Sequence, residues 1–128
     1  MPHITLDYSA NLEDVIDLQA FCDHLRVAAS EIETFPMPGI RVRALKAAYY
    51  SIADGDPKHG FVDISVRLRG GRPQAVKAEA TEALFEAARK FLEPALVTHS
   101  IALSLEMRDI DPALSPKTGT IRDHLKDA

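Results

Sequence analysis

The sequence places a proline directly behind the initiator methionine, at the head of a stretch that alternates apolar and polar residues. Removal of a methionine that precedes a small residue would leave Pro2 with a free secondary amine. A neutral amine is a base, so Pro2 is a candidate for moving a proton on a bound substrate. A structural role is the alternative, because proline is tolerated as the first residue of a strand, where its missing N–H costs no ladder hydrogen bond.

Arginine side chains cluster at two places along the chain. The clusters consist of Arg41 and Arg43 on one predicted strand, and of Arg67, Arg69 and Arg72 at the end of another. Guanidinium groups hold carboxylates through paired hydrogen bonds, and Arg72 lies where a helix is expected to begin, a position that attracts anions. Taken singly, each arginine is best explained as a solvated or salt-bridged edge residue. Together with the Pro2 amine, they predict a pocket for a small dicarboxylate with a base in its middle.

Other kinds of catalytic or metal-binding site find little support in the sequence. The five histidines contain no pair at metal-ligand spacing, and the single cysteine, Cys22, excludes a thiolate zinc site and an intrachain disulfide. Cys22 falls on the apolar stripe of a predicted helix and is interpreted as a small buried hydrophobe. Neither Cys22 nor any serine lies in a recognisable nucleophile motif. We therefore expect no metal ion and no bound cofactor.

Length and composition predict one globular domain spanning residues 1–128. The chain is 46% hydrophobic and 27% charged, as in ordinary globular proteins. It contains no apolar run of about 18 residues and no signal-peptide pattern, so we expect no membrane partner and a cytoplasmic location. The net charge of −4 argues against a nucleic-acid partner, which would require a basic face.

Hydrophobic periodicity predicts the order strand, helix, strand, followed by a second strand, helix and strand. The predicted strands cover residues 2–9, 40–55, 61–70 and 99–110. The first helix is expected to start from a cap at Asn11 or Asp17 and to end before the proline-rich segment 35–39. The second is expected to start at Pro73 and to stop near Pro94. The tail is expected to be a loop, with a short helix at 121–126.

The buried faces of the two helices follow from the spacing of their apolar residues. The first face comprises Leu18, Cys22, Leu25, Ala29 and Ile32, and the second comprises Val76, Ala80, Ala83, Ala87 and Phe91.

This order predicts an α/β (α+β) fold made of two β-α-β repeats. Each helix is long enough to serve as the crossover between two parallel strands. The simplest arrangement is a four-stranded mixed sheet with both helices on one face. Because such a sheet leaves its other face uncovered, we also expect the chain to form an oligomer.

Four segments, taken together, resemble the 5-carboxymethyl-2-hydroxymuconate Δ-isomerase family of the tautomerase superfamily. They are "PHITLDYSANLE", "FPMPGIRVRA", "ADG" before "FVDISVRLRGGR", and "ALSLEMRDIDPAL". The resemblance extends over nearly the whole chain in order and without large gaps. It is specific in combination, although each segment alone would be weak.

The resemblance implies a homotrimer whose sheets enclose a common core, with active sites between neighbouring subunits. It implies that Pro2 is the general base and that Arg41 and Arg72 hold the carboxylates of the substrate. The implied reaction needs no cofactor: a proton moves from the 2-hydroxyl of a dienol carboxylate to a distant carbon, giving an unsaturated 2-oxo acid. This step belongs to the breakdown of aromatic hydroxyphenylacetates in the homoprotocatechuate pathway.

The chemistry of the amine bears on this reading and on two alternatives. A free α-amino group has a pKa of roughly 7.7 to 8, and an apolar site with arginines nearby should lower the pKa of the Pro2 amine so that it is free to act as a base. A Pro2 amine that stays cationic would instead act as an acid in a hydratase or dehalogenase. The third reading is a ligand-binding oligomeric module that is not an enzyme and does not use the amine.

Overall fold

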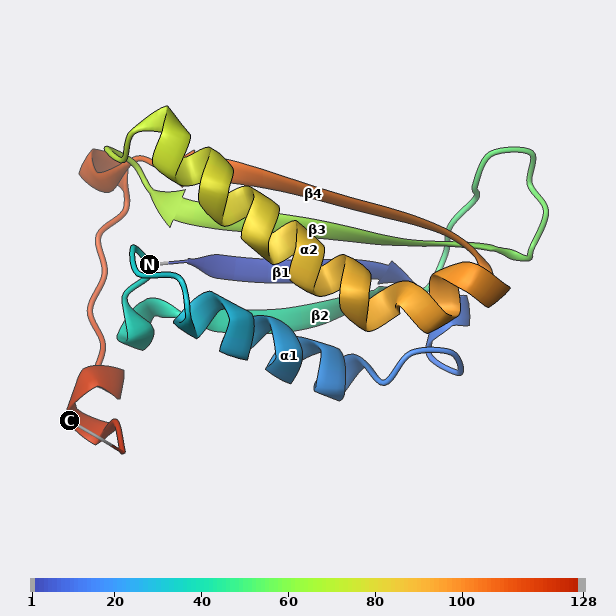
Figure 1. Cartoon of the computed structure of the whole chain (residues 1–128), viewed down its shortest axis with the longest axis horizontal. Coiled ribbons are helices and arrows are strands. Elements are labelled where there is room, and N and C mark those ends of the chain that lie inside the picture. Colours follow the sequence, from blue (N-terminus) through green and yellow to red (C-terminus); the bar gives the residue numbers. More distant parts are fainter. Residues whose placement is uncertain (1, 127–128) are drawn as a thin grey trace.

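The computed structural model describes residues 2–126 as two β-α-β units followed by a C-terminal segment (Figure 1). The first unit consists of β1 (His3–Ser9), α1 (Leu18–Ser30) and β2 (Arg41–Ala47). The second consists of β3 (His59–Arg69), α2 (Gln74–Thr98) and β4 (Ser100–Ile110). Four short 3₁₀ helices complete the described chain: η1 (Ala10–Leu12), η2 (Met37–Gly39), η3 (Pro112–Leu114) and η4 (Ile121–His124).

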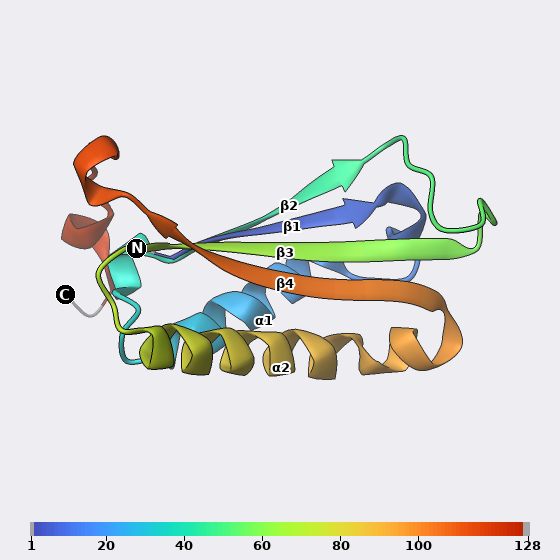
Figure 2. The ribbon, with the colours of Figure 1, turned by 90° about the horizontal axis from the view of Figure 1, so that it is seen from above.

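All four strands form one sheet in the order β2-β1-β3-β4. β1 and β2 are parallel, β3 and β4 are parallel, and the two units meet through the antiparallel pair β1 and β3. Both helices lie on the same face of the sheet, and the opposite face is uncovered (Figure 2). The predicted four-stranded mixed sheet with two helices on one face is therefore confirmed.

The core lies between the sheet and the two helices. Every second residue of the central strands faces the helices because the side-chain period of a strand is two. The fully buried apolar side chains of β1 and β3 are Ile4, Leu6, Val62, Ile64, Val66 and Leu68. The helices cover them with Phe21, Leu25, Ala29, Ala80, Leu84, Ala88 and Leu92. The two helices also contact each other, with the rings of Phe21 and Phe91 stacked at a centroid distance of 4.8 Å.

The uncovered face of the sheet is polar and carries charges of both signs, including the ion pair of Arg108 with Glu106 at 3.3 Å. At the edge where β1 begins, the strand register aligns four cationic or ionisable residues in one row: Arg41, His3, Arg67 and Arg108. Further along the sheet, Asp7 lies directly opposite Asp63 on the neighbouring strand. Like charges at this position are unfavourable in an isolated subunit.

The start of α1 agrees with one of the two predicted caps. The Asp17 carboxylate accepts a hydrogen bond from the Ala20 amide at 3.0 Å, which satisfies one of the free N–H groups of the first turn. Asn11 instead donates from its side-chain amide to the carbonyl oxygen of His59 at 2.7 Å. It therefore connects η1 to the start of β3.

Two predicted boundaries were wrong. β2 ends at Ala47 rather than near residue 55, because Ala47 pairs with Ser9, the last residue of β1, and the chain beyond has no neighbouring strand. α2 continues through Pro94 to Thr98, because Leu92 is buried and the following turn packs against the core. Its fully buried stripe agrees with the predicted one at Ala80 and then lies one residue further along, at Leu84, Ala88 and Leu92.

Within residues 2–126, no helix combines the length and the apolar composition that crossing a membrane requires.

Replacement of Pro94 by alanine should stabilise the protein. Pro94 is exposed and lacks the N–H that would bond to the carbonyl four residues earlier, and a proline inside a helix costs about 3 kcal/mol. We expect Pro94→Ala to raise the free energy of unfolding by up to that amount in urea titrations. Glu93→Ala is the matched control, because it changes the neighbouring exposed residue without adding a backbone donor. A destabilised Pro94→Ala variant would contradict this account.

Candidate active site

The strand directions bring four distant segments of the chain to one edge of the sheet. Parallel strands begin at the same edge, so the starts of β1 and β2 lie together. Because β3 runs antiparallel to β1, the ends of β3 and β4 reach that same edge. In Figure 1 the N-terminal end of β1, the β3–α2 turn and the C-terminal segment all lie at this end of the molecule.

A cavity of about 660 Å³ lies at this edge. Its volume is within the usual range for small-molecule sites. The lining residues come from the start of β1, the segment before β2, the end of β3 with the turn that follows, and the C-terminal segment. They include His3, Gly39, Arg41, Arg69, Arg72, Ile110, Lys117, Gly119 and Arg122, with prolines at positions 36, 38, 112 and 116.

The lining is strongly cationic. Arg41, Arg69, Arg72, Lys117 and Arg122 all contribute to it, and no Asp or Glu among residues 2–126 does. None of these five cations forms an ion pair with a carboxylate within the part of the chain that the structure describes. A concave site with charges of one sign concentrates counter-ions. The cavity is therefore suited to a small molecule with several negative charges.

Pro2 is fully buried beside this cavity. Its carbonyl oxygen accepts a hydrogen bond from the Arg41 amide at 3.3 Å, so the entry to β1 is fixed to the start of β2. Pro2 is not itself among the lining residues, but the next residue, His3, is. Met1, whose removal would free the amine of Pro2, lies outside the described residues.

The structure brings only some of the predicted arginines to the cavity. Arg41, Arg69 and Arg72 line it, whereas Arg43 and Arg67 do not. Arg43 follows Arg41 on the same side of β2, but one row further from the edge.

The guanidinium of Arg72 is fixed by the backbone. It donates to the carbonyl oxygens of Arg69 and Thr34, both at 2.9 Å. These bonds join the β3–α2 turn to the segment between α1 and η2. Carbonyl oxygens do not neutralise the charge, and a guanidinium has five N–H donors. Arg72 is thus held in place while it keeps its charge and further donors for a ligand.

His3 is held in its neutral form. Burial lowers the pKa of its imidazole, and the charges of Arg41 and Arg67 lower it further. The distance between Nδ1 of His3 and Nη2 of Arg67 is 3.2 Å, and because a guanidinium only donates, Nδ1 must accept. The proton of the neutral ring is therefore on Nε2, which is buried and has no hydrogen-bond partner among residues 2–126.

Sequence reasoning missed three of the cavity's ionisable residues, namely His3, Lys117 and Arg122. His3 lies in the alternating stretch 2–9, whose pattern indicates a strand and nothing more. The two cations of the C-terminal segment lie in a stretch without periodicity, which gave no sign that it returns to the site. The one available signal was the presence of basic residues between prolines and a glycine, which is also typical of a solvated loop.

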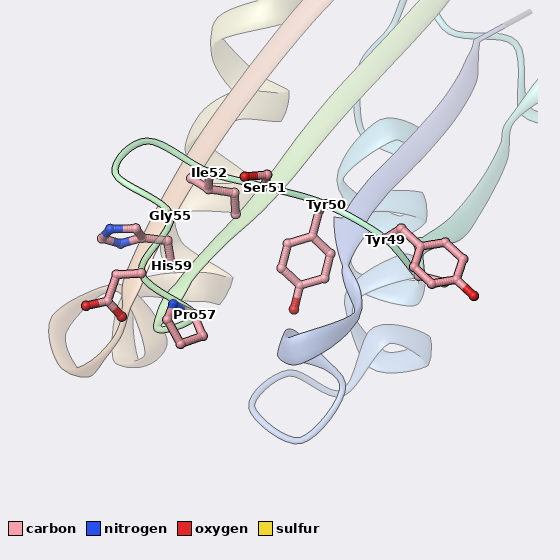
Figure 3. Close-up of a pocket in the computed structure, with 9 residues that line it drawn as sticks. Tyr49, Tyr50, Ser51, Ile52, Gly55, Pro57 and His59 are labelled. Carbon is pink, nitrogen blue, oxygen red and sulfur yellow. The ribbon is translucent and has the colours of Figure 1, made fainter.

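A second, smaller cavity of about 400 Å³ lies at the opposite end of the sheet, under the β2–β3 loop (Figure 3). Tyr49, Tyr50, Pro57 and His59 are among its lining residues, and Tyr49 is 96% exposed. Among the described residues, no arginine or lysine lines it. This cavity lacks the charges that would hold an anion.

His59 in this second cavity has the contacts of a structural residue. Its ring nitrogens lie 2.7 Å from the Ser100 hydroxyl and 2.8 Å from the Asp54 carboxylate. The backbone N–H groups of Asp56 and Lys58 are bonded to the side chains of Asp54 and Asp56. Because the loop's own carboxylates take up these donors, they are not available to an oxyanion, and the network holds the loop against the start of β4.

Comparison with known proteins gives a consistent family relationship. The family model described as 5-carboxymethyl-2-hydroxymuconate isomerase matches residues 2–125. The 5-carboxymethyl-2-hydroxymuconate Delta-isomerase of Escherichia coli is 26% identical over 121 residues, which cover 94% of this chain and 96% of that protein. A crystal structure of a 5-carboxymethyl-2-hydroxymuconate delta-isomerase superposes with a TM-score of 0.90 at 30% identity, covering 97% of this chain and 92% of that one.

A more distant structure shows the same fold. It is described as a fused 4-OT wild type symmetric trimer, and it superposes with a TM-score of 0.64 at 19% identity over 85% of each chain. The fold is that of the tautomerase superfamily. Since the family model matches nearly the whole chain, the protein belongs to the 5-carboxymethyl-2-hydroxymuconate isomerase family and is an isomerase.

Proposed function

We propose that this isomerase converts a 2-hydroxymuconate-type dienol, with 5-carboxymethyl-2-hydroxymuconate as its substrate, to the unsaturated 2-oxo isomer without a cofactor. The observation that carries the proposal is the cavity beside Pro2, whose lining, as far as residues 2–126 form it, has five cations and no carboxylate. A carboxymethyl muconate has three carboxylate groups, which makes it a trianion at neutral pH. A site of this charge suits such a substrate better than a neutral enol.

Pro2 acts in this proposal as the base that transfers the proton. Its amine takes the proton from the 2-hydroxyl, the electron pair moves through the conjugated chain, and the proton returns to a distant carbon. One O–H bond breaks and one C–H bond forms, so the product is an isomer. A single base suffices because both atoms lie on the same side of a planar substrate.

The surroundings of Pro2 favour this role once Met1 is removed. Burial disfavours the charged ammonium, and neighbouring cations disfavour it further, so both should lower the pKa of the amine. The same cations stabilise the negative charge that develops on the dienolate oxygen. Arg41 and Arg72 are proposed to hold carboxylates of the substrate, with Arg72 positioned by its bonds to the backbone.

The working form is proposed to be a homotrimer. The uncovered face of the sheet is the surface available for assembly, and its basic row and acidic residues lie at different positions along the strands. In a cyclic arrangement, this face of one subunit can pack against the same face of the next two subunits. The symmetric trimer among the structures with this fold supports the same arrangement.

Substitution of Pro2 should remove most of the activity. We expect Pro2→Ala to lower kcat by about 10²- to 10⁴-fold, the usual contribution of a general base. The assay follows the loss of ultraviolet absorbance of 5-carboxymethyl-2-hydroxymuconate, with mass spectrometry to confirm that Met1 is absent from both proteins. Pro94→Ala is the control, because it replaces a proline far from the cavity. Undiminished activity in Pro2→Ala would exclude Pro2 as the base.

The protonation state of Pro2 separates the isomerase mechanism from hydratase or dehalogenase chemistry. An NMR titration of the ¹⁵N-labelled amine should give a pKa below the ordinary range of roughly 7.7 to 8 for an α-amino group. A value well above 8 would favour a cationic Pro2 that acts as an acid.

Replacement of Arg41 should impair catalysis. We expect Arg41→Gln to lower kcat/KM by roughly 10- to 100-fold, because the carboxylate of the substrate loses a charge-assisted hydrogen bond. Arg26→Gln on the exposed side of α1 removes the same charge far from the cavity and should leave kcat/KM unchanged. If both variants lose activity equally, the effect is that of net charge, and Arg41 does not bind the substrate.

A further inference from the structure

The C-terminal segment, residues 111–126, crosses the end of the sheet and forms one wall of the cavity. It leaves β4 at Ile110 and runs past the start of β1 to η4 on the side of β2 (Figure 1). Residues from Pro112 to Arg122 line the cavity along this path. The segment therefore spans the edge at which the other three lining segments meet.

Specific local contacts set the direction of this segment. The Asp111 carboxylate accepts a hydrogen bond from the Ala113 amide at 2.9 Å, and the Asp111 carbonyl accepts one from Leu114 at 3.1 Å. This capped turn, with Pro112 at its start, redirects the chain from the strand towards the cavity. Asp111 keeps its charge but is not among the residues that line the cavity, and its carboxylate faces the Ala113 amide.

The wall made by this segment has the same charge as the opposite wall. It contributes Lys117 and Arg122, together with the hydroxyl-bearing residues Ser115 and Thr118. Asp123 follows directly after Arg122 but does not line the cavity. The other three cations come from β2, β3 and the β3–α2 turn, so positive charges surround the cavity on two sides.

Two cationic walls pose a specific question about the ligand. The conjugated part of the substrate must lie next to Pro2, which is joined to the wall that contains Arg41. A carboxylate that branches away from this part would lose its hydration, and without a compensating partner that loss is unfavourable. Only the C-terminal wall supplies cations on that side.

We infer that Lys117 and Arg122 form a separate carboxylate subsite, which holds the carboxymethyl branch of the substrate. This inference rests on the proposed function. It makes the C-terminal segment responsible for the preference of the enzyme for branched over unbranched muconates. These two residues bind and position the branch. They do not take part in the transfer of the proton.

The experiment compares two substrates that differ only in this branch, 5-carboxymethyl-2-hydroxymuconate and 2-hydroxymuconate. We expect Lys117→Gln and Arg122→Gln each to lower kcat/KM for the branched substrate by roughly 10- to 100-fold, with less than about 3-fold change for the unbranched one. Arg122→Lys, which keeps the charge, should retain part of the preference. Lys126→Gln is the matched control, because it removes a charge from the same segment outside the cavity lining.

The outcomes separate this inference from the proposed function. An equal loss on both substrates, or no loss on either, would overturn the subsite. If the unaltered protein converts neither substrate, the proposed function fails. The subsite is then tested by calorimetry, which compares the binding of propane-1,2,3-tricarboxylate with that of glutarate, a molecule that lacks the central carboxylate. Tighter binding of the tricarboxylate that is lost in Lys117→Gln and Arg122→Gln would support the subsite. If these variants still bind the tricarboxylate more tightly than glutarate, the subsite is excluded.

Discussion

The antiparallel pairing of β1 with β3 is the constraint on which the rest of the structure depends. Each β-α-β unit alone would place the starts of its two strands at one edge and their ends at the other. By joining the units in opposite directions, the β1–β3 pair brings the beginning of the first unit and the end of the second to a common edge. One cavity is consequently surrounded by four parts of the chain. They are the segment with the buried Pro2, the two strands that carry arginines, the turn before α2 and the C-terminal segment.

The concentration of positive charge at this edge is unfavourable for the isolated subunit, and two features of the structure limit its effect. Arg72 is bonded to two carbonyl oxygens, which fixes its position without removing its charge. His3 lies between Arg41 and Arg67 in the strand register and avoids a further charge by remaining neutral. The remaining excess of positive charge suits an anionic ligand, because its binding offsets the repulsion between the cationic side chains. The positive charges at this edge thus lower the stability of the free protein and favour the binding of an anionic ligand.

Much of the fold could be predicted from local sequence patterns, and the errors occurred where a distant contact outweighed a local preference. Asp17 caps α1 because its interaction is confined to one helical turn. Pro94 does not end α2, because the burial of Leu92 and the contacts of the last turn outweigh the lost hydrogen bond. The end of β2 could not be read from its own residues, since it depends on where β1 stops.

The sequence by itself determined the alternation of the strands, the two crossover helices and the family relationship, because these depend on periodicity and on motifs that are continuous along the chain. It also indicated Pro2, Arg41 and Arg72 as candidates through residue type and position. Only the tertiary structure decided that Lys117 and Arg122 lie in the same cavity, that Arg43 does not, and that the ring of His3 is neutral. These properties depend on distances between segments far apart in the chain, which follow from the pairing of the strands and from the path of the C-terminal segment.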